Sequence, residues 1–344
     1  MRVIVIFGGR SSEHDVSCFS AASVIGNMPS HEVTKIGITL DGKWFRTDAT
    51  VSQIASGEWE KCPNEPVSID INNNCFLSAG KRIRADVVFP VLHGRNGEDG
   101  RIQGLFEMMR IPYVGSRVLG SALCMDKAFT NLIFDRYGIN HVSWFPVEKT
   151  DYLKDKDGIL RRVKARLHWP VFVKPSNAGS SMGISKCRSD EALTAAFELA
   201  FSHDTRVIVE QGLEHIREVE VAVMGNSEPV VSVVGRIQPA SDFYDYEAKY
   251  SNPESKLFIP ADIEPRVAEE IRNIALVAYK ACDCKGLSRV DFFVDNANTV
   301  YINEINTLPG FTSISMYPKL FEASGVPYEE LIDRLLAYAL EFGA

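Results

Sequence analysis

Two acidic residues on neighbouring strand-like segments form the clearest chemical pattern in the sequence. Asp291 lies in the run 289–294 and Glu304 in the run 299–306, and the polar residues 295–298 separate the two runs. Two β-rich runs joined by a short polar turn predict a β-hairpin. Carboxylates on one face of such a hairpin are the hard oxygen ligands that Mg²⁺ prefers, with water and phosphate oxygens completing its shell.

The predicted register of this hairpin places its polar residues on one face. A four-residue turn puts Asp291 opposite Ile302, and it puts Arg289 opposite Glu304. Side chains alternate with a period of two along a strand, so one face carries Arg289, Asp291, Glu304 and Asn306. The alternative is a solvated polar edge. We favour the metal site because apolar residues are expected on the same face, namely Phe293, Val300 and Ile302.

A second pattern is typical of phosphate binding. Lys174 ends the apolar run 170–174, and the glycine- and serine-rich turn 175–183 follows it. Backbone N–H groups in such a turn can bind phosphate oxygens, while the lysine supplies a positive charge. The turn does not match GxxxxGK[ST], which excludes a P-loop. An ordinary loop is the alternative.

Two further loops follow predicted strands near the N-terminus. Gly8-Gly9 leads through Glu13 into a helix, whose N-terminal end could bind an anion. Glu13 either caps that helix or binds an ammonium group. The loop 93–100 holds three glycines and several ionisable residues, which favours a functional loop, although His93 alone is also typical of a buried core histidine.

Alternating strands and helices must position these loops. In the first third, strand–turn–helix units predict an open, parallel α/β sheet with its site at the carboxyl ends of the strands. Its strands are expected at 2–7, 33–40 and 87–92, its helices at 16–25 and 102–109, and 41–80 is expected to decorate it.

From about residue 127 the pattern changes. Strands are expected at 170–174 and 206–209, with a helix at 191–202 between them. Antiparallel strands at 219–224 and 230–234, a long polar and aromatic loop at 238–256 and helices at 265–283 and 327–342 follow. Loops of that length are usually functional or disordered.

Composition limits the classes of protein. The chain has 344 residues, which predicts two or three domains. Its 37 Lys and Arg against 45 Asp and Glu give a net charge of −8, so nucleic acid and membrane surfaces are not expected partners. Seven cysteines without a CxxC pair, together with the lack of a signal-like or spanning segment, predict a reducing cytoplasm. Cys282 and Cys284 are expected to be free buried thiols.

Taken together, these segments resemble the D-alanine–D-alanine ligase family of the ATP-grasp superfamily. The resemblance covers nearly the whole chain. Its motifs are GGRSSEHDVS at 8–17, HGRNGEDG at 93–100, MDK at 125–127, VKPSNAGSSMG at 173–183, FYDYEAKY at 243–250, SRVDFF at 288–293 and NEINTLPGFTSISMYP at 303–318.

The resemblance implies an α/β fold of the ATP-grasp type with an N-terminal open parallel, Rossmann-like domain. Residues 1–126 would bind substrate, 127–212 would form the central subdomain, and 213–344 would carry the metal site and a mobile loop at 238–256. A homodimer formed through the N-terminal domain is also implied.

The family analogy also assigns ligands. ATP would lie between the central and C-terminal domains and contact Lys127, Lys174, Ser181, Gly183, Glu210, Gln211, Leu213, Glu218 and Lys249. Two Mg²⁺ ions, or Mn²⁺, would be bound by Asp291, Glu304 and Asn306.

The implied reaction joins two D-alanine molecules through a D-alanyl phosphate, for peptidoglycan precursors. Glu13 would bind the first ammonium group, and Arg289 with the N–H of Gly310 would stabilise the oxyanion. His93 would lie near the transferred phosphoryl group. The remaining roles fall to Tyr250, reaching Ser180 and Glu13, and to Ser315 and Met316 at the second carboxylate.

Three alternatives stay open. Relatives that use D-serine or D-lactate as the second substrate share the fold and the metal site, although Tyr250 and Met316 resemble the dipeptide-forming type. Another ATP-grasp carboxylate–amine ligase would share the hairpin but lack the features at Glu13 and Tyr250. A nucleotide-binding sensor would not need the complete set Asp291, Glu304 and Asn306.

Overall fold

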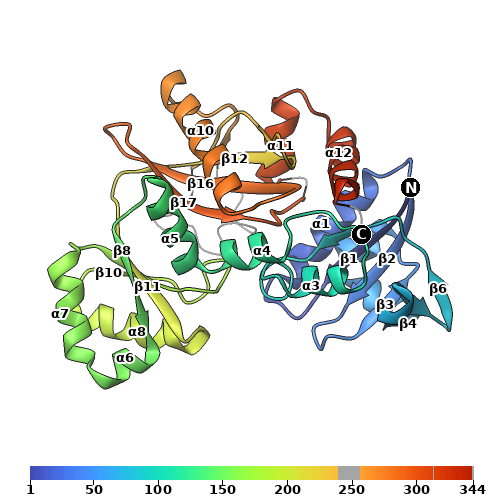
Figure 1. Ribbon diagram of the computed structural model, residues 1–344, viewed down its shortest axis with the longest axis horizontal. Coiled ribbons are helices and arrows are strands. Elements are labelled where there is room, and N and C mark those ends of the chain that lie inside the picture. The colour runs from blue at the N-terminus through green and yellow to red at the C-terminus, as the bar shows by residue number, and fades with distance from the viewer. Residues whose placement is uncertain (239–255, 313, 343–344) are drawn as a thin grey trace.

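The computed structural model describes residues 1–238, 256–312 and 314–342. Their strands form three sheets of seven, four and six strands. Figure 1 shows the seven-stranded and four-stranded sheets at opposite ends of the molecule, with the six-stranded sheet between them. This mixture of sheets and covering helices confirms the predicted α/β class.

The N-terminal sheet has the strand order β6-β5-β4-β3-β2-β1-β7. Strand β1 is parallel to β2 and β7 and is buried along nearly its whole length, which confirms the predicted parallel core. The expectation that 41–80 only decorates this sheet is wrong, because β3 to β6 extend it as antiparallel strands. Strand β4 is mostly exposed and therefore lacks a long apolar run. The strands are β1 (Arg2–Gly8), β2 (Glu32–Ile38), β3 (Trp44–Thr47), β4 (Asn64–Asp70), β5 (Cys75–Ser78), β6 (Lys81–Ile83) and β7 (Val87–Val91).

The helices of this part confirm the two that the sequence predicts, as α1 and α3. They are α1 (His14–Gly26), α2 (Val51–Ala55), α3 (Arg101–Met108) and α4 (Val118–Met125), with short 3₁₀ helices at Glu58–Lys61 and Ile71–Asn73. Gly8 ends β1 at φ +83°, and an added Cβ would clash with the carbonyl oxygen of Ile38. Only glycine permits this turn, which leads from β1 towards Glu13 and α1.

The central sheet is antiparallel, with the order β10-β9-β11-β8. Its strands are β8 (Trp144–Glu148), β9 (Val171–Pro175), β10 (Ser185–Cys187) and β11 (Arg206–Gln211), and its helices are α5 (Lys127–Tyr137), α6 (Lys149–Lys154), α7 (Lys156–Arg166) and α8 (Asp190–His203). The predicted strands at 170–174 and 206–209 and the helix at 191–202 are confirmed. Asp126 caps α5 by accepting from the N–H groups of Ala128 and Phe129.

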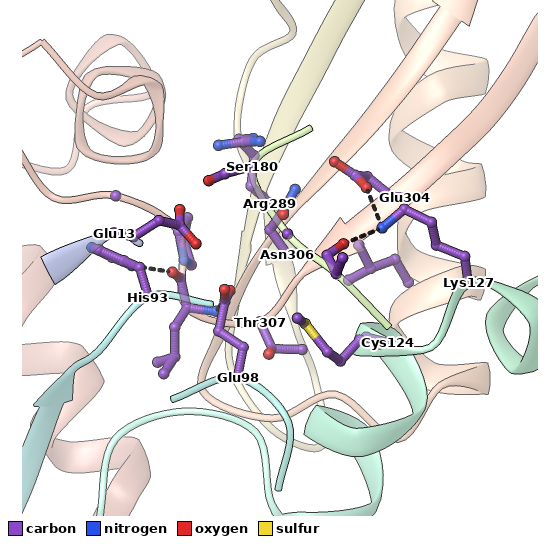
Figure 2. Close-up of a pocket in the computed structure, with 17 residues that line it drawn as sticks. Glu13, His93, Glu98, Cys124, Lys127, Ser180, Arg289, Glu304, Asn306 and Thr307 are labelled. Atoms are coloured by element: carbon purple, nitrogen blue, oxygen red, sulfur yellow. Dashed lines mark hydrogen bonds and ion pairs between the residues drawn. The ribbon is translucent and has the colours of Figure 1, made fainter. Parts of the chain in front are cut away.

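The C-terminal sheet has the order β15-β14-β12-β16-β17, with β13 paired to β12. The strands are β12 (Arg217–Met224), β13 (Val230–Val231), β14 (Gly235–Gln238), β15 (Lys256–Phe258), β16 (Leu287–Val294) and β17 (Val300–Asn306), and the helices are α10 (Pro265–Ala281), α11 (Met316–Ala323) and α12 (Tyr328–Glu341). Beyond β17 the chain lines the cavity shown in Figure 2. The predicted mobile loop 238–256 lies, apart from its two ends, outside the described residues.

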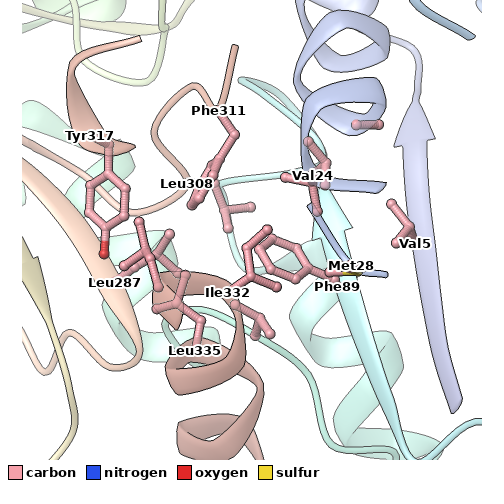
Figure 3. Close-up of a cluster of buried hydrophobic side chains, with 14 of the residues drawn as sticks. Val5, Val24, Met28, Phe89, Leu287, Leu308, Phe311, Tyr317, Ile332 and Leu335 are labelled. Carbon is pink, nitrogen blue, oxygen red and sulfur yellow. The ribbon is translucent and has the colours of Figure 1, made fainter. Parts of the chain in front are cut away.

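One buried apolar cluster joins the N-terminal sheet to the C-terminal helices (Figure 3). Phe89 of β7 and Leu335 of α12 belong to this cluster, and the rings of Phe89 and Phe311 meet edge to face with centroids 5.8 Å apart. Because Phe311 follows β17, the contact fixes the chain beyond β17 against the N-terminal sheet. Cys282 and Cys284 are free and buried, as predicted. Across the described ranges, no helix is both long and apolar enough to cross a bilayer.

We predict that Leu335→Ala lowers the free energy of unfolding by about 2–5 kcal/mol, because truncation leaves a cavity in this shared cluster. Leu335 is 0% exposed, whereas Leu340 on the same helix is 41% exposed, so Leu340→Ala should change stability by less than about 0.5 kcal/mol. Urea denaturation of both variants measures the difference. Equal destabilisation by the two substitutions would contradict the packing described.

Candidate active site

Two adjoining cavities lie where the three sheets approach one another. The smaller has a volume of about 90 Å³ and the larger about 760 Å³. They share Lys127, Ser180, Arg289, Glu304 and Gly310 in their walls. Figure 2 shows the side chains of the small cavity converging from the N-terminal loops, the Gly/Ser turn and β17.

The β16–β17 hairpin carries the predicted metal ligands in a different register from the one predicted. Asp291 lies opposite Glu304, and Arg289 lies opposite Asn306. The predicted pairings of Arg289 with Glu304 and of Asp291 with Ile302 are therefore wrong. The polar residues still share one face, because they occupy the partly exposed positions between buried ones.

Two local irregularities cause this shift. The turn holds five residues, 295–299, instead of four, and a bulge then skips Asn303 in the pairing with β16. The extra residue turns Glu304 to the cavity side of the sheet. Val300 and Ile302 were predicted on that polar face, but they are buried in the apolar core on the other side.

Arg289 neutralises the acidic group at the centre of this face. Its Nε and Nη2 donate to the two carboxylate oxygens of Asp291, each over 2.7 Å, and Nε lies 3.2 Å from Oε2 of Glu220. Burial by itself lowers the pKa of Arg289, but the adjacent carboxylates outweigh burial and raise that pKa well above its ordinary value. A bidentate pair fixes the guanidinium plane, so Arg289 is an oriented, permanent cation.

Two lysines flank the Gly/Ser turn. Lys127 Nζ lies 3.6 Å from Oε2 of Glu304 and donates to the carbonyl oxygen of Ala178 over 2.9 Å. Lys174 forms an ion pair of 2.6 Å with Glu210. Both lysines line the larger cavity, where their ammonium groups can bind an anionic ligand.

The Glu13 side chain lies against two glycines, Gly94 and Gly179. Gly94 has φ +70°, and an added Cβ there would clash with Oε2 of Glu13. A Cβ on Gly179 would lie 3.4 Å from the same oxygen. The two glycines therefore make room for a buried carboxylate at the wall of the small cavity.

His93 and Glu98 also line the small cavity. Burial lowers the pKa of His93, so the ring is neutral. Burial, together with the negative charge of Glu13, raises the pKa of Glu98 to about 8. Glu98 therefore holds a proton at neutral pH, which limits the negative charge inside the cavity.

The two cavities bring together most residues that the sequence analysis singles out. The small cavity is lined by Glu13, His93, Lys127, Ser180, Arg289, Glu304, Asn306 and Gly310. The large one adds Lys174, Ser181, Glu210, Gln211, Leu213, Glu218, Asp291, Ser315 and Met316. Gly183 lines neither cavity and packs instead against His203 and Pro175. Lys249 and Tyr250 lie outside the described residues.

Two carboxylates of the site, those of Glu98 and Glu220, have no role in the sequence-based predictions. Glu98 lies within the motif 93–100, yet only His93 of that motif receives a role. Glu220 is buried opposite Asp291 on the neighbouring strand β12. The period-two spacing of Glu218 and Glu220, the latter followed by the apolar run 221–224, is the signal that points to Glu220.

Comparisons with known proteins agree with this architecture. The family model described as D-ala D-ala ligase N-terminus matches residues 2–116, and the one described as D-ala D-ala ligase C-terminus matches residues 133–337. A D-alanine–D-alanine ligase of Acetivibrio thermocellus is 48% identical, with 99% of this chain and 96% of that protein covered. One of Clostridium novyi is 47% identical, covering 99% of this chain and 98% of that protein.

Solved structures agree as well. The VanG D-Ala:D-Ser ligase from Enterococcus faecalis superposes with a TM-score of 0.90 at 38% identity, covering 98% of this chain and 99% of that one. The D-alanine–D-alanine ligase from Coxiella burnetii superposes with a TM-score of 0.88 at 34% identity, covering 99% of this chain and 94% of that one. The fold is thus that of the ATP-grasp class, as predicted. Within that class, the chain belongs to the D-alanine–D-alanine ligase family.

We predict a pH-dependent contribution of Glu98 to stability. In an unfolded chain a glutamate has a pKa of about 4.3, whereas in the folded protein that of Glu98 is about 8. The folded state therefore keeps a proton that the unfolded state loses. The contribution is fully present below about pH 4 and is lost as the pH rises towards 8.

Melting temperatures of the wild type and Glu98→Gln, measured from pH 4 to pH 9, test this prediction. The wild type should lose stability relative to the variant as the pH rises, because the amide does not titrate. A difference that stays constant across this range would contradict the assigned protonation.

Proposed function

We propose that this chain joins two D-alanine molecules into D-alanyl-D-alanine, using ATP and releasing ADP and phosphate, for peptidoglycan precursor synthesis. The observation that carries the proposal is the small cavity, in which the Glu13 carboxylate and the Arg289 guanidinium are held beside Lys127 and the large cavity. The full-length similarity to D-alanine–D-alanine ligases supports the same reaction.

The size of the small cavity supports a small amino acid as the first substrate. A water needs roughly 10–15 Å³ of such volume, so about 90 Å³ holds on the order of six water-sized groups. D-Alanine has a similar number of non-hydrogen atoms. Glu13 would bind the ammonium group of D-alanine. The carboxylate of D-alanine would then face Lys127 and the larger cavity.

The larger cavity supports ATP as the second ligand. In the proposal, Lys174 and Lys127 contact the phosphates together with the backbone near Ser181 and Gly183. The adenine and ribose lie at the other end, near Glu210, Gln211, Leu213 and Glu218, and Lys249 also contacts the nucleotide. All of these except Gly183 and Lys249 line the described cavity walls.

The donor set of the hairpin fits Mg²⁺ or Mn²⁺. Asp291 and Glu304 face each other across the two strands, and Asn306 adds an amide beside Asp291. Within the described part of the chain, no group of three His, Cys, Asp or Glu side chains forms a metal cluster. Two carboxylates and an amide leave room for the water and phosphate ligands that Mg²⁺ prefers. When bound, such ions would neutralise phosphate charge.

The reaction then proceeds in two steps. The carboxylate of the first D-alanine attacks the γ-phosphorus of ATP, the bond to the ADP oxygen breaks, and D-alanyl phosphate forms. The amine of the second D-alanine attacks the acyl carbon and loses a proton. The tetrahedral intermediate expels phosphate and leaves the peptide bond. Arg289 and the N–H of Gly310 would stabilise the developing oxyanion.

D-Serine as the second substrate is the alternative that an observation favours, because the chain superposes closely on a D-Ala:D-Ser ligase. We prefer D-alanine because the more similar full-length relatives are D-alanine–D-alanine ligases. Ser315 and Met316 would bind the second carboxylate near the start of α11. Tyr250 would contact Ser180 and Glu13.

The proposal also includes the domain boundaries, the oligomeric state and the cellular location. We place the domain boundaries near residues 126 and 212, one before α5 and the other after β11. A homodimer formed through the N-terminal domain and a cytoplasmic location are implied by the family and belong to the proposal. None of them is required by the chemistry above.

We predict that Glu304→Gln reduces ADP formation in the presence of D-alanine at least 100-fold, because it removes one carboxylate from the proposed metal ligands. Mg²⁺ titration should show weakened activation, and circular dichroism should show an intact fold. Glu322→Gln, an exposed carboxylate on α11, serves as the matched control with wild-type turnover. Turnover of Glu304→Gln within a few-fold of wild type at saturating Mg²⁺ would refute the metal assignment.

We also predict that D-alanyl-D-alanine is the main product when D-alanine, D-serine and D-lactate compete as acceptors. Attack requires a free amine, whose population rises roughly tenfold per pH unit below its pKa. The dipeptide share should therefore increase from pH 6 to pH 8.5, as measured by mass spectrometry. A majority of D-alanyl-D-serine would favour D-serine as the acceptor. A majority of the depsipeptide D-alanyl-D-lactate at both pH values would exclude D-alanine and D-serine as the main acceptors.

A further inference from the structure

Leu308 lies two residues before Gly310, and both of its backbone polar groups bond to side chains from the N-terminal part of the chain. Its N–H donates to Oε1 of Glu98 over 3.3 Å. Its carbonyl oxygen accepts from Nδ1 of His93 over 2.9 Å. Because Leu308 lies beyond the end of β17, these side chains, rather than a sheet ladder, set the position of its backbone.

A second anchor holds the other side of Gly310. The N–H of Phe311 donates to Oγ of Ser20 over 3.2 Å, and the same oxygen lies 3.0 Å from Nε2 of His93. Nδ1 carries the proton that is donated to Leu308, so the neutral ring accepts the Ser20 hydroxyl at Nε2. Both ring nitrogens of His93 are therefore used within this network, on either side of Gly310.

Glu98 extends the network towards the first substrate. Its second oxygen, Oε2, accepts from the N–H of Gly94 over 2.7 Å. Gly94 in turn lies directly against the carboxylate of Glu13. One carboxyl group thus connects the backbone beside Glu13 to the backbone that leads to Gly310, and Glu13, Glu98, Leu308 and Gly310 all line the small cavity.

We propose that Glu98 is a positioning residue. By joining Leu308 to Gly94, it holds the N–H of Gly310 at the place where negative charge develops on the acyl oxygen. The proposal rests on the proposed ligation, in which that N–H and Arg289 face the oxyanion. Such donors act only when they are pre-organised, and a displacement of about 1 Å can reduce a rate on the order of 100-fold. His93 positions the same segment through the carbonyl group of Leu308.

The decisive variant is Glu98→Ala. We expect kcat to fall about 10–100-fold, while KM for ATP stays within about twofold because Lys174 and Glu210 are untouched. Inhibition by a phosphinate dipeptide analogue, which mimics the tetrahedral intermediate, should weaken by the same factor as kcat. A merely structural role would not weaken the tetrahedral analogue selectively. If Glu98→Ala does not fold, Glu98→Gln keeps the volume and one acceptor oxygen and should show a smaller loss of the same kind.

Asp99 provides a matched control in the same loop. Its buried carboxylate also accepts from two backbone N–H groups, but both are local, at Asn96 of the same loop and at Arg101, the first residue of α3. Asp99→Ala should therefore keep kcat within about threefold. In the double variant His93→Ala/Glu98→Ala, the fold-reduction of kcat should be smaller than the product of the two single fold-reductions, because both side chains act on Leu308.

Three outcomes would overturn the proposal: unchanged kcat in Glu98→Ala, equal weakening of ATP and the tetrahedral analogue, or an equal loss in Asp99→Ala. Failure of the proposed function looks different, since the wild type itself would then form no D-alanyl-D-alanine from ATP and D-alanine. The wild-type assay therefore separates the two failures.

Discussion

The structure depends on balancing several carboxylates inside one partly buried cavity. Like charges at short range are unfavourable where water is scarce, and the small cavity alone is lined by Glu13, Glu98 and Glu304. The protein supplies Arg289 as a bidentate partner for Asp291 and a lysine beside Glu304, and it keeps a proton on Glu98. The result is an ordered set of charges that is in place before any substrate binds, as electrostatic catalysis requires.

This balance is possible only because distant parts of the chain meet with little freedom. Glu13 and Glu98 follow strands of the N-terminal sheet, whereas Arg289 and Glu304 come from the hairpin of the C-terminal sheet. The apolar cluster around Phe89, Phe311 and α12 holds these two sheets together. Hydrogen bonds through Leu308 then adjust the final backbone segment, so packing sets the coarse geometry and polar contacts set the fine geometry.

Much of this organisation was accessible from the sequence. The buried run 2–7, the glycine turn at Gly8 and the strand that opens the motif 173–183 each have a local physical signature, and the structure places them as predicted. The hairpin register was not accessible, because a five-residue turn and a bulge at Asn303 leave no clear pattern in the residue types. The hydrogen bonds of Glu98 were not accessible either. Both of its partners are backbone N–H groups, which no motif records, and one of them, Leu308, lies 210 residues away in the sequence.

In the proposed reaction, the carboxylate of the first substrate is activated by phosphoryl transfer in this cavity. The most direct measurement follows ¹⁸O from D-alanine labelled in both carboxylate oxygens, incubated with ATP, Mg²⁺ and the wild-type protein. We predict one ¹⁸O atom in inorganic phosphate for each D-alanyl-D-alanine formed, because the carboxylate oxygen that attacks phosphorus leaves with the phosphate. Dipeptide formation with unlabelled phosphate, or with AMP and pyrophosphate as products, would contradict it.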